Sequence, residues 1–481
     1  MTFRRLLHVL LLLGVAFMMS GTTGDPDLWG HVRFGQDMLS HGTVRLADTY
    51  SFTADRTWIN HEWLAELLMA VAYDRLGSAG LNLLRIATIA SALALVWFAS
   101  QGIAERRRVM LVAACALGIY MRALPIRPQI FSLLLFAALL TLLQRSDDQR
   151  SLRPLLGVPF VMAAWVNLHG GWVVGLGFFA LWTAMRVARS REHRGAIAGI
   201  FGLACAATLL NPYGPAMWDF LADTVRVERP MIGDWQPLYT LPALFWTSYL
   251  AALAIFVLAA RSSTRDQWMR LAMAASLGVA AIRVSRLDAF FALASVFLAA
   301  AVLPKSETAL PQPRRVSGSP VFAVVLALCL LPIGYLVVVR VVSVPVPASM
   351  MPDSNVAAYV RDAKLKGHVL TWFNWGEYSI WHFGPDLKVS MDGRRETVYS
   401  AEVVAAHLDF YFGASNTWRY ADAIKADYVW IPKQLPVARE LQLNGWHRLC
   451  EGDISILLSR QPQVRQCDQH GSAGDRLFPQ L

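Results

Sequence analysis

Residues 4–31 read RRLLHVLLLLGVAFMMSGTTGDPDLWGH. Two arginines precede an apolar run, and an acidic pair, Asp25 and Asp27, follows it. A second polar segment, from Asn60 to Glu66, opens a predicted helix that leads into a long apolar region. Ionisable groups at a membrane boundary are costly to place and usually serve a function. Both segments therefore mark candidate functional positions at the edge of a membrane domain.

The composition is that of a polytopic membrane protein. Of the 481 residues, 55% are hydrophobic and 16% are charged, whereas a soluble domain carries about a quarter charged residues. Apolar stretches recur from Leu6 to Arg340, and we predict about eleven α-helical spans. The spans cover residues 6–20, 80–103, 109–122, 129–144, 154–168, 172–187, 196–210, 242–260, 268–282, 287–303 and 319–340.

The net charge of +10 does not indicate nucleic-acid binding, because the basic residues lie in the membrane half. Residues 341–481 hold 14 basic and 15 acidic residues. Loops on the side of the N-terminus carry 18 lysines and arginines, about twice as many as the opposite loops. This bias predicts a cytoplasmic N-terminus and an extracytoplasmic C-terminal part. The segment 6–20 also resembles a signal peptide, but we expect an uncleaved first helix.

The predicted organisation has three parts. Residues 1–340 form a transmembrane domain with a first external loop at 21–79. Residues 341–460 form a small extracytoplasmic α/β domain, with a helix over 353–366 and strands over 368–373, 387–391 and 427–431. Residues 461–481 form a flexible tail. Cys450, in the α/β domain, and Cys467, in the tail, could pair if the compartment is oxidising, although spacing alone does not fix the pairing.

The acidic residues have two interpretations each. Asp25 and Asp27 can chelate a hard divalent cation such as Mg²⁺ or Mn²⁺, or one can act as a general base while the other positions it; the alternative is a surface turn. Glu62 opens a helix over 62–76 that we expect to lie in the membrane interface; the alternative is stabilisation by the helix dipole alone. His31 and His61 stand beside these groups as ligands or as interfacial polar residues.

Arginines at the predicted external ends of spans are candidate phosphate ligands. Guanidinium groups bind phosphate in a bidentate manner, and the alternative is snorkelling to lipid headgroups. These arginines are Arg122, Arg127, Arg283 and Arg286. His169 lies in the short connection Asn167-Leu-His169-Gly-Gly. It is either a further polar group at the external ends of the spans or part of a tight chain reversal. The turns at 372–377 and 392–396 follow predicted strands, where α/β domains often bind ligands; plain structural turns are the alternative.

Taken together, these motifs resemble the GT-C superfamily of glycosyltransferases, and the chain is similar to bacterial polytopic membrane proteins of that class. The resemblance covers nearly the whole chain. It rests on an acidic pair in an early external loop, an interfacial helix after it, many spans and a C-terminal external domain. The matching patterns are Asp25-x-Asp27-x-Trp29-x-His31, Asn60-His61-Glu62-Trp63-Leu64, Arg127-Pro128, Asn167-x-His169-Gly170, Asn211-Pro-Tyr-Gly214 and Asp392-Gly-Arg394.

The resemblance implies an inverting enzyme of the bacterial inner membrane that moves a hexose or pentose from a polyprenyl-phosphate donor to an extracytoplasmic glycan, lipid or protein. Asp27, Asp25 and Glu62 would be catalytic. His31, His61, Arg122, Arg127, His169, Arg283 and Arg286 would bind substrate. The expected partners are the lipid-linked donor and membrane lipids, and a divalent cation at Asp25 and Asp27 is compatible with the pattern but not required.

Two other classes of function stay open at this point. A transporter in envelope polysaccharide export would show charged or broken helices at the bilayer midplane and internal repeat symmetry. A non-enzymatic scaffold or receptor would use the C-terminal domain and could dispense with the acidic loop. Alanine at Asp25 and Asp27 separates an enzyme from both, because activity would be lost while stability is kept.

The topology is open to a direct test. In otherwise cysteine-free protein, Asn416→Cys should react with a membrane-impermeant thiol reagent added from outside, because arginine bias places residue 416 on that side. His193→Cys, in a predicted cytoplasmic loop, is the matched control and should react only after the membrane is opened. The reverse labelling pattern would place every candidate site residue on the wrong side.

Overall fold

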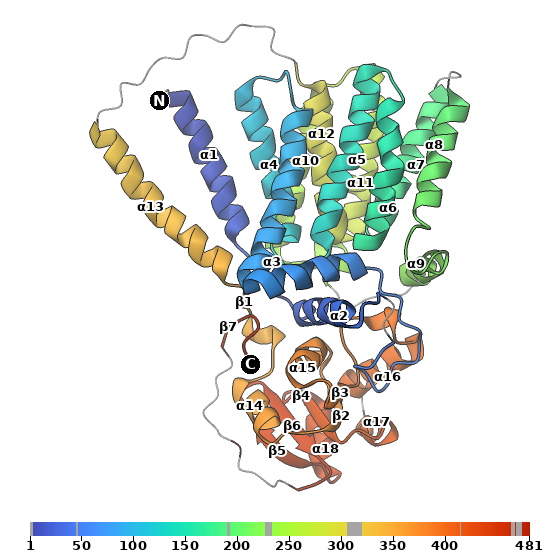
Figure 1. Cartoon of the computed structure of the whole chain (residues 1–481), viewed down its shortest axis with the longest axis vertical. Helices are drawn as coiled ribbons and strands as arrows, with labels where there is room; N and C mark the ends of the chain where they lie inside the picture. The colour runs from blue at the N-terminus through green and yellow to red at the C-terminus, as the bar shows by residue number, and fades with distance from the viewer. Residues whose placement is uncertain are drawn as a thin grey trace. The chain divides into compact units, whose positions relative to one another are not determined.

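The structure is a computed structural model of the whole chain (Figure 1), and it describes residues 3–44, 47–189, 193–226, 233–304, 320–413, 415–462, 467 and 474–481. The chain forms two compact units. The first is Met1–Thr22 with Leu81–Val342, and the second is Thr23–Gly80 with Ser343–Leu481. The first external loop, which the sequence analysis grouped with the helices, therefore folds with the C-terminal residues.

The first unit is a helical bundle, and each of the eleven predicted spans coincides with a helix. Its helices are α1 (Phe3–Ser20), the second part of α3 (Trp63–Ala99), α4 (Glu105–Ala123), α5 (Gln129–Gln149), α6 (Val158–Leu168), α7 (Trp172–Arg189), α8 (Arg194–Ala207), α9 (Ala216–Arg226), α10 (Ala243–Arg261), α11 (Trp268–Arg283), α12 (Asp288–Val302) and α13 (Pro320–Val342). Helix α9, inside a predicted external loop, was not predicted.

Four helices of the described residues are long and apolar enough to cross a membrane. They are Trp63–Ala99, Gln129–Gln149, Ala243–Arg261 and Ser285–Val302, the last including a short 3₁₀ turn before α12. Shorter apolar helices include Val9–Ser20, Arg153–Leu168, Arg194–Ala207 and Leu331–Val342. The predicted class, a helical membrane protein, is confirmed at this level, while the number of crossings stays a prediction.

Helix α12 is the centre of the bundle. It packs against α4, α5, α10 and α11, and its residues from Asp288 to Ala300 are all buried. Its sequence is almost entirely alanine, phenylalanine, leucine and valine, so it is apolar on every side, as expected of a helix that other helices surround. Asp288 is the exception, and it lies at the first position of the helix.

The second unit combines helices from the first loop with a C-terminal α/β domain. Its helices are α2 (Leu28–His41), the first part of α3, α14 (Ser354–Asp362), α15 (Gly376–Phe383), α16 (Ala401–Phe412), α17 (Arg419–Ala423) and α18 (Pro436–Leu443). Its strands are β1 (Pro345–Val346), β2 (Gly367–Thr371), β3 (Leu387–Val389), β4 (Tyr428–Pro432), β5 (His447–Glu451), β6 (Ser455–Ser459) and β7 (Arg476–Leu477).

The main sheet has five strands in the order β3-β2-β4-β6-β5. Strands β3, β2 and β4 run parallel, and β6 and β5 join as antiparallel strands. The three parallel strands and helix α14 are the elements that the sequence predicted for this domain. Because β2 and β3 are parallel, their carboxyl ends reach the same edge of the sheet, and the segments that follow them start there.

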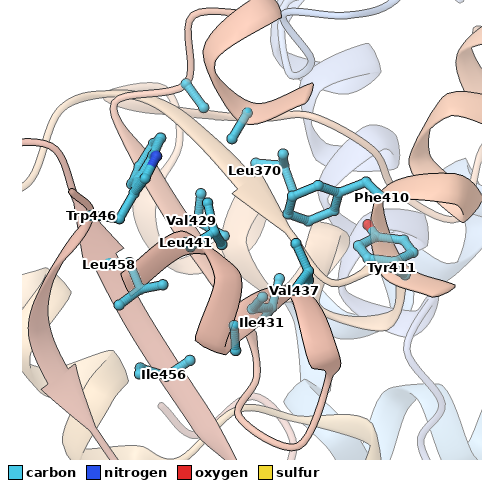
Figure 2. Close-up of a cluster of buried hydrophobic side chains, with 13 residues drawn as sticks. Leu370, Phe410, Tyr411, Val429, Ile431, Val437, Leu441, Trp446, Ile456 and Leu458 are labelled. Atoms are coloured by element: carbon cyan, nitrogen blue, oxygen red, sulfur yellow. The ribbon is translucent and has the colours of Figure 1, made fainter. Parts of the chain in front are cut away.

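Helices cover both faces of this sheet. On one face, Val429 and Ile431 of β4 pack against Phe410 of α16 and Leu441 of α18, as Figure 2 shows. On the other face, the ring of Trp430 lies against two rings: that of Trp375, immediately before α15, and that of Phe383, at the end of α15. Successive side chains along β4 point to opposite faces of the sheet, and both sets are buried because helices cover both faces.

Two helices of the first external loop belong to this unit. Helix α2 begins after Asp27 and is followed by Gly42, which has the left-handed conformation common at helix ends. Helix α3 begins at Trp63, one residue later than predicted, and Gly77 interrupts it with a non-helical conformation. This break falls at the end of the predicted interfacial helix and separates it from the predicted span that starts at residue 80.

A buried arginine joins the loop to the C-terminal domain. Arg394 donates two hydrogen bonds to Asp392, from Nε at 2.9 Å and from Nη2 at 2.7 Å, and a third to Asp48 at 2.8 Å. Its guanidinium carbon also lies about 5 Å from the ring centres of Phe34 and Trp58. We call these contacts the Arg394 clamp; it ties the segment 23–80 to the end of β3.

The end of the chain is also tied to the domain. Strand β7, within the segment predicted as a flexible tail, pairs with β1 in antiparallel fashion. Cys450 and Cys467 form a disulfide with a Cα–Cα separation of 5.3 Å. The two cysteines whose pairing the sequence left open are therefore bonded.

Replacing Arg394 with methionine should destabilise the second unit by about 3–5 kcal/mol, because Asp392 would be left charged and buried without its partner. Arg361→Met is the matched control, since Arg361 and Asp362 form an exposed pair and surface substitutions change stability by about 0.5 kcal/mol or less. Chemical unfolding of the purified full-length protein measures both. Equal destabilisation by the two substitutions would contradict the structural role of the clamp.

Candidate functional site

The second unit brings together six ionisable residues that are far apart in sequence. Asp27 immediately precedes helix α2, and His31 lies in its first turn. Glu62 immediately precedes helix α3, and Glu66 lies in its first turn. The segments after β2 and β3 supply Glu377 and Asp392. We call these six residues the acidic site. Asp27 and His31 are partly exposed, as are Glu62 and its neighbour His61, whereas the other three carboxylates are buried. The partly exposed groups are those that a substrate can reach.

Asp25 positions Asp27. The Asp25 side chain is buried, and its Oδ1 accepts a hydrogen bond from the backbone N–H of Asp27 at 3.2 Å. The adjacent Gly24 N–H donates to the carbonyl of Pro345 at 2.8 Å, so the same turn is attached to the C-terminal residues. Asp27 then takes the position immediately before α2, with its side chain at the positive end of the helix.

Glu377 is the buried partner of Asp27. Its Oε2 accepts a hydrogen bond from the backbone N–H of Gly30 at 3.1 Å. A Cβ atom on Gly30 would collide with the Glu377 carboxylate, and a Cβ on Gly393 would collide with both Asp27 Oδ1 and Glu377 Oε1. Glycine at these two positions therefore lets the two carboxylates approach each other.

The electrostatic environment raises the proton affinity of this pair. Burial, and then the charges of Asp27 and Asp392, raise the pKa of Glu377 well above its ordinary value. Burial also raises the pKa of Asp27, against an opposing effect of the charge on His31. Two carboxylates that lie this close together and are largely shielded from water bind protons as a coupled pair. The pair can therefore hold a proton under conditions in which isolated carboxylates are ionised.

Asp392 behaves in the opposite way. Burial alone would raise its pKa, but the charge and hydrogen bonds of Arg394 outweigh burial and lower the pKa. The hydroxyl of Tyr399 adds a hydrogen bond to Asp392 Oδ2 at 2.8 Å. Asp392 is thus an ionised structural anchor whose oxygens are already used, and it is not suited to accept a substrate proton.

His31 is held as a cation. Its Nδ1 lies 3.2 Å from Glu66 Oε1, and the other Glu66 oxygen accepts a hydrogen bond from Asn60 Nδ2 at 2.5 Å. Burial lowers the pKa of His31, but the hydrogen bond to Glu66 and the charges of the nearby carboxylates outweigh burial and raise the pKa to about 9. A positive charge therefore stands beside Asp27 at neutral pH.

The acidic site also contains a group that could hold a metal ion. His31, Glu62 and Glu66 each offer one ligand atom, and these atoms lie within 4.8 Å of one another. His61 Nε2 lies 3.5 Å from Glu62 Oε1, which places a second imidazole nearby. Mixed imidazole and carboxylate ligands suit divalent transition metals. The predicted cation pair, Asp25 and Asp27, stays a prediction.

The first unit contains a second charged group, which we call the arginine cluster: Arg122, Arg127, Arg286, Asp234 and Asp288. Arg122 donates to both oxygens of Asp288, at 2.9 and 3.2 Å, and also to Asp234. Arg127 lies 3.6 Å from Asp234, and the Arg286 guanidinium lies 4.8 Å from the centre of the Trp235 ring. With three arginines and two aspartates, the cluster has a net charge of +1.

Within this cluster the arginines have different surroundings. The Arg122 side chain is only 4% exposed and contacts two carboxylates, whereas the Arg127 side chain is 27% exposed. Burial would raise the pKa of Asp234, but the charges of Arg122, Arg127 and Arg286 lower it, so its charge is maintained. Arg127 is therefore better placed than Arg122 to meet an anion from outside.

The remaining predicted residues of this unit lie apart from those contacts. Arg283 is exposed at the end of α11. His169 is buried, and its Nδ1 lies 2.6 Å from Ser132 Oγ and accepts a hydrogen bond from the Gly171 N–H at 3.0 Å. These contacts fix the connection between α6 and α7. The predicted substrate roles of both residues stay predictions.

Sequence reasoning did not select several residues that the structure places at these sites. Glu377 lies at the start of α15, which follows β2, and Asp392 lies in the turn after β3, so their position after strand ends was the available signal. Glu66 lies four residues after Glu62, one helical turn along the same helix. Asp234 and Asp288 could be recognised only once their partner Arg122 was known, because ion pairs across a bundle leave no local pattern.

Comparison with known proteins supports the fold. No protein-family model matches the sequence, and no curated protein matches it. Among 17 solved chains that match is the crystal structure of ArnT from Cupriavidus metallidurans bound to undecaprenyl phosphate. The similarity has a TM-score of 0.51 at 11% sequence identity and covers 95% of this chain and 98% of that chain.

A similarity of this extent at such low identity is a similarity of fold. Because it covers nearly the whole of both chains, it includes both the helical unit and the α/β unit. The predicted fold class, a helical membrane protein with a small C-terminal α/β domain, agrees with this similarity of fold. The residues of the acidic site must be argued from their own chemistry.

Proposed function

We propose that this protein is a membrane glycosyltransferase that moves a sugar from a polyprenyl-phosphate donor to an extracytoplasmic acceptor, with inversion at the anomeric carbon. The observation that carries the proposal is the position of Asp27, a partly exposed residue, beside the buried Glu377. The similarity in fold to ArnT, whose crystal structure contains undecaprenyl phosphate, supports the choice of a polyprenyl-phosphate donor.

In the proposed reaction Asp27 is the general base. It takes the proton of an acceptor hydroxyl, and the acceptor oxygen forms a bond to the anomeric carbon on the face opposite the phosphate. The bond between that carbon and the phosphate oxygen breaks, and its electron pair leaves with the polyprenyl phosphate. A carboxylate whose pKa lies above the ordinary value is the stronger base for this step.

Neighbouring residues would hold Asp27 in position, stabilise its ionised form or bind hydroxyl groups of the substrates. Glu377 and the Asp25 turn hold the base in place, because each is attached to the backbone at the start of α2. The His31 cation would stabilise the ionised form of Asp27 before the reaction. Glu62 and His61, both partly exposed, are placed to bind acceptor or sugar hydroxyls.

The arginine cluster is the proposed binding site for the phosphate of the donor. Arg127 and Arg286 would hold the phosphate of the donor lipid by charge-assisted hydrogen bonds. Arg122 would mainly hold the cluster together, since it bridges Asp234 and Asp288. Arg283 and His169 are proposed to bind more peripheral parts of the substrate.

The proposed location is the inner membrane of a bacterium, with the second unit outside the cytoplasm. The arginine bias of the loops supports this orientation. The Cys450–Cys467 disulfide supports it independently, because disulfides persist in oxidising compartments such as the periplasm.

A divalent cation is compatible with this proposal but is not needed for the step described. His31, Glu62 and Glu66 fit such an ion better than the predicted Asp25–Asp27 pair. Their ligand atoms converge, whereas Asp25 already accepts a hydrogen bond from the backbone of Asp27. A metal ion held there would replace the proton of His31, because a ligating imidazole is neutral, and would put its own positive charge beside the base.

Replacing Asp27 with asparagine should lower sugar transfer by about 10²–10⁴-fold, the range typical for loss of a general base. Asp25→Asn should lower it by about tenfold or less, since the amide oxygen can still accept the Asp27 N–H and one such bond contributes about 1 kcal/mol. Transfer from a polyprenyl-phosphate sugar in purified membranes measures both.

Asp386→Asn is the matched control, because Asp386 is exposed and pairs with Lys366 at the surface. Near-normal transfer by Asp27→Asn, at a normal protein level, would rule out Asp27 as the base. Equal, complete loss in the Asp25 and Asp27 variants would contradict the division of roles.

Arg127→Ala should raise the donor KM, with a smaller effect on turnover, because it removes a contact to the phosphate. Arg127→Lys should restore only part of the affinity, since an ammonium group cannot present the planar fork of a guanidinium. Arg265→Ala, at an exposed position near the start of α11, is the control. A donor KM unchanged by Arg127→Ala would exclude this residue from the phosphate site.

A further inference from the structure

A groove between four helices of the first unit has no role in the proposed reaction. It lies among α5, α7, α11 and α12 and has a cavity volume of about 50 Å³. Its walls are mostly apolar and include Leu143, Phe178, Trp182, Ala274 and Phe297. A narrow apolar groove between membrane helices suits a hydrocarbon chain better than a polar metabolite.

One end of the groove, which we call its mouth, is charged: Arg270 and Asp147 line it, and Asp148 and Arg186 lie against these two residues. Arg270 donates to Asp147 Oδ2, at 3.0 Å from Nη2 and 3.3 Å from Nε, and its Nη2 lies 3.6 Å from Asp148 Oδ1. Arg186 lies 3.9 Å from the other Asp147 oxygen. All four side chains are partly exposed, with exposed fractions from 20% for Asp147 to 46% for Asp148. The mouth therefore offers charges of both signs to a ligand.

The position of the mouth along the helices is that of lipid headgroups. Asp147 lies in the last turn of α5, Arg186 in the last turn of α7, and Arg270 in the first turn of α11. Trp182 lines the groove, and Trp268, two residues before Arg270, is 49% exposed. Tryptophan is enriched at the level where the hydrocarbon core meets the headgroups. The apolar walls and the charged mouth thus match the two parts of a lipid.

The charges select among lipid classes. A headgroup that carries only a phosphate would approach Arg270 but would also meet the carboxylates of Asp147 and Asp148. A headgroup with a phosphate and a primary ammonium meets both signs, because the phosphate can bind Arg270 and Arg186 while the ammonium binds Asp148. Polyprenyl phosphate, which lacks the ammonium, fits this mouth less well.

We propose that this groove binds one phosphatidylethanolamine molecule, with an acyl chain between α7 and α12 and the headgroup at the Arg270–Asp148 end. On the predicted topology this end is cytoplasmic, opposite to the side proposed for sugar transfer. The proposal rests on the groove and its charges, and it holds whether or not the acidic site transfers sugar.

Two alanines on α11 give a matched pair of variants. Ala274 lines the groove and is buried, whereas Ala272, two residues earlier on the same helix, is exposed. Tryptophan at residue 274 would fill the groove, and tryptophan at residue 272 would add the same bulk outside it. A third variant, Asp148→Asn, changes the headgroup end at a residue exposed enough not to affect folding.

The experiment is native mass spectrometry of the purified, delipidated full-length protein titrated with dioleoyl-phosphatidylethanolamine or dioleoyl-phosphatidylglycerol. We expect one molecule of phosphatidylethanolamine to bind with about tenfold preference over phosphatidylglycerol, a difference of about 1.4 kcal/mol. Ala274→Trp should abolish this binding and Ala272→Trp should keep it. Asp148→Asn should remove the preference, and it tests the proposal if Ala274→Trp does not fold.

Three results would overturn the proposal. They are the absence of a saturable lipid, equal binding of both lipids to the wild type, and equal loss in the Ala272 and Ala274 variants. Preferential binding of undecaprenyl phosphate in the same titration would also contradict it, because that lipid has no ammonium for Asp148.

Discussion

The second unit depends on one buried ion pair, that between Arg394 and Asp392. Arg394 neutralises Asp392 with two hydrogen bonds and reaches Asp48 with a third, inside a group of aromatic rings from the first loop. The pair therefore does more than balance two charges, because it fixes a segment near the N-terminus beside a strand end more than 300 residues later. Together with the hydrogen bonds from Gly30 to Glu377 and from Gly24 to Pro345, this attachment holds Asp27 beside Glu377.

The contrast between the carboxylates follows from how each is compensated. Asp392 has a guanidinium partner, and its pKa is lowered; Glu377 has a single backbone N–H and carboxylate neighbours, and its pKa is raised. Asp27 lies between these cases, with His31 on one side and acidic residues on the other. A site that contains both an anchored anion and a carboxylate with raised proton affinity has the elements that acid–base chemistry requires.

The sequence predicted the elements that local patterns encode. The apolar runs of α12 and β4 were sufficient to place both elements, and Asp27 of the predicted acidic pair belongs to the group of ionisable residues that the structure brings together. Helix α2 was missed because its residues are mixed in polarity and it follows a proline-containing turn. Glu377 and Asp392 were seen only as turns, since their proximity to Asp27 arises from the parallel sheet and from long-range ion pairs that no local pattern records.

On the proposed function, this protein consumes a lipid-linked sugar. Mass spectrometry of polyprenyl-phosphate sugars in membranes measures this, by comparing a strain that lacks this protein with the same strain carrying the wild-type chain. One polyprenyl-phosphate sugar should accumulate in the absence of the protein and return to its normal level with the wild-type chain. Identical pools of all such lipids in the two strains would contradict it.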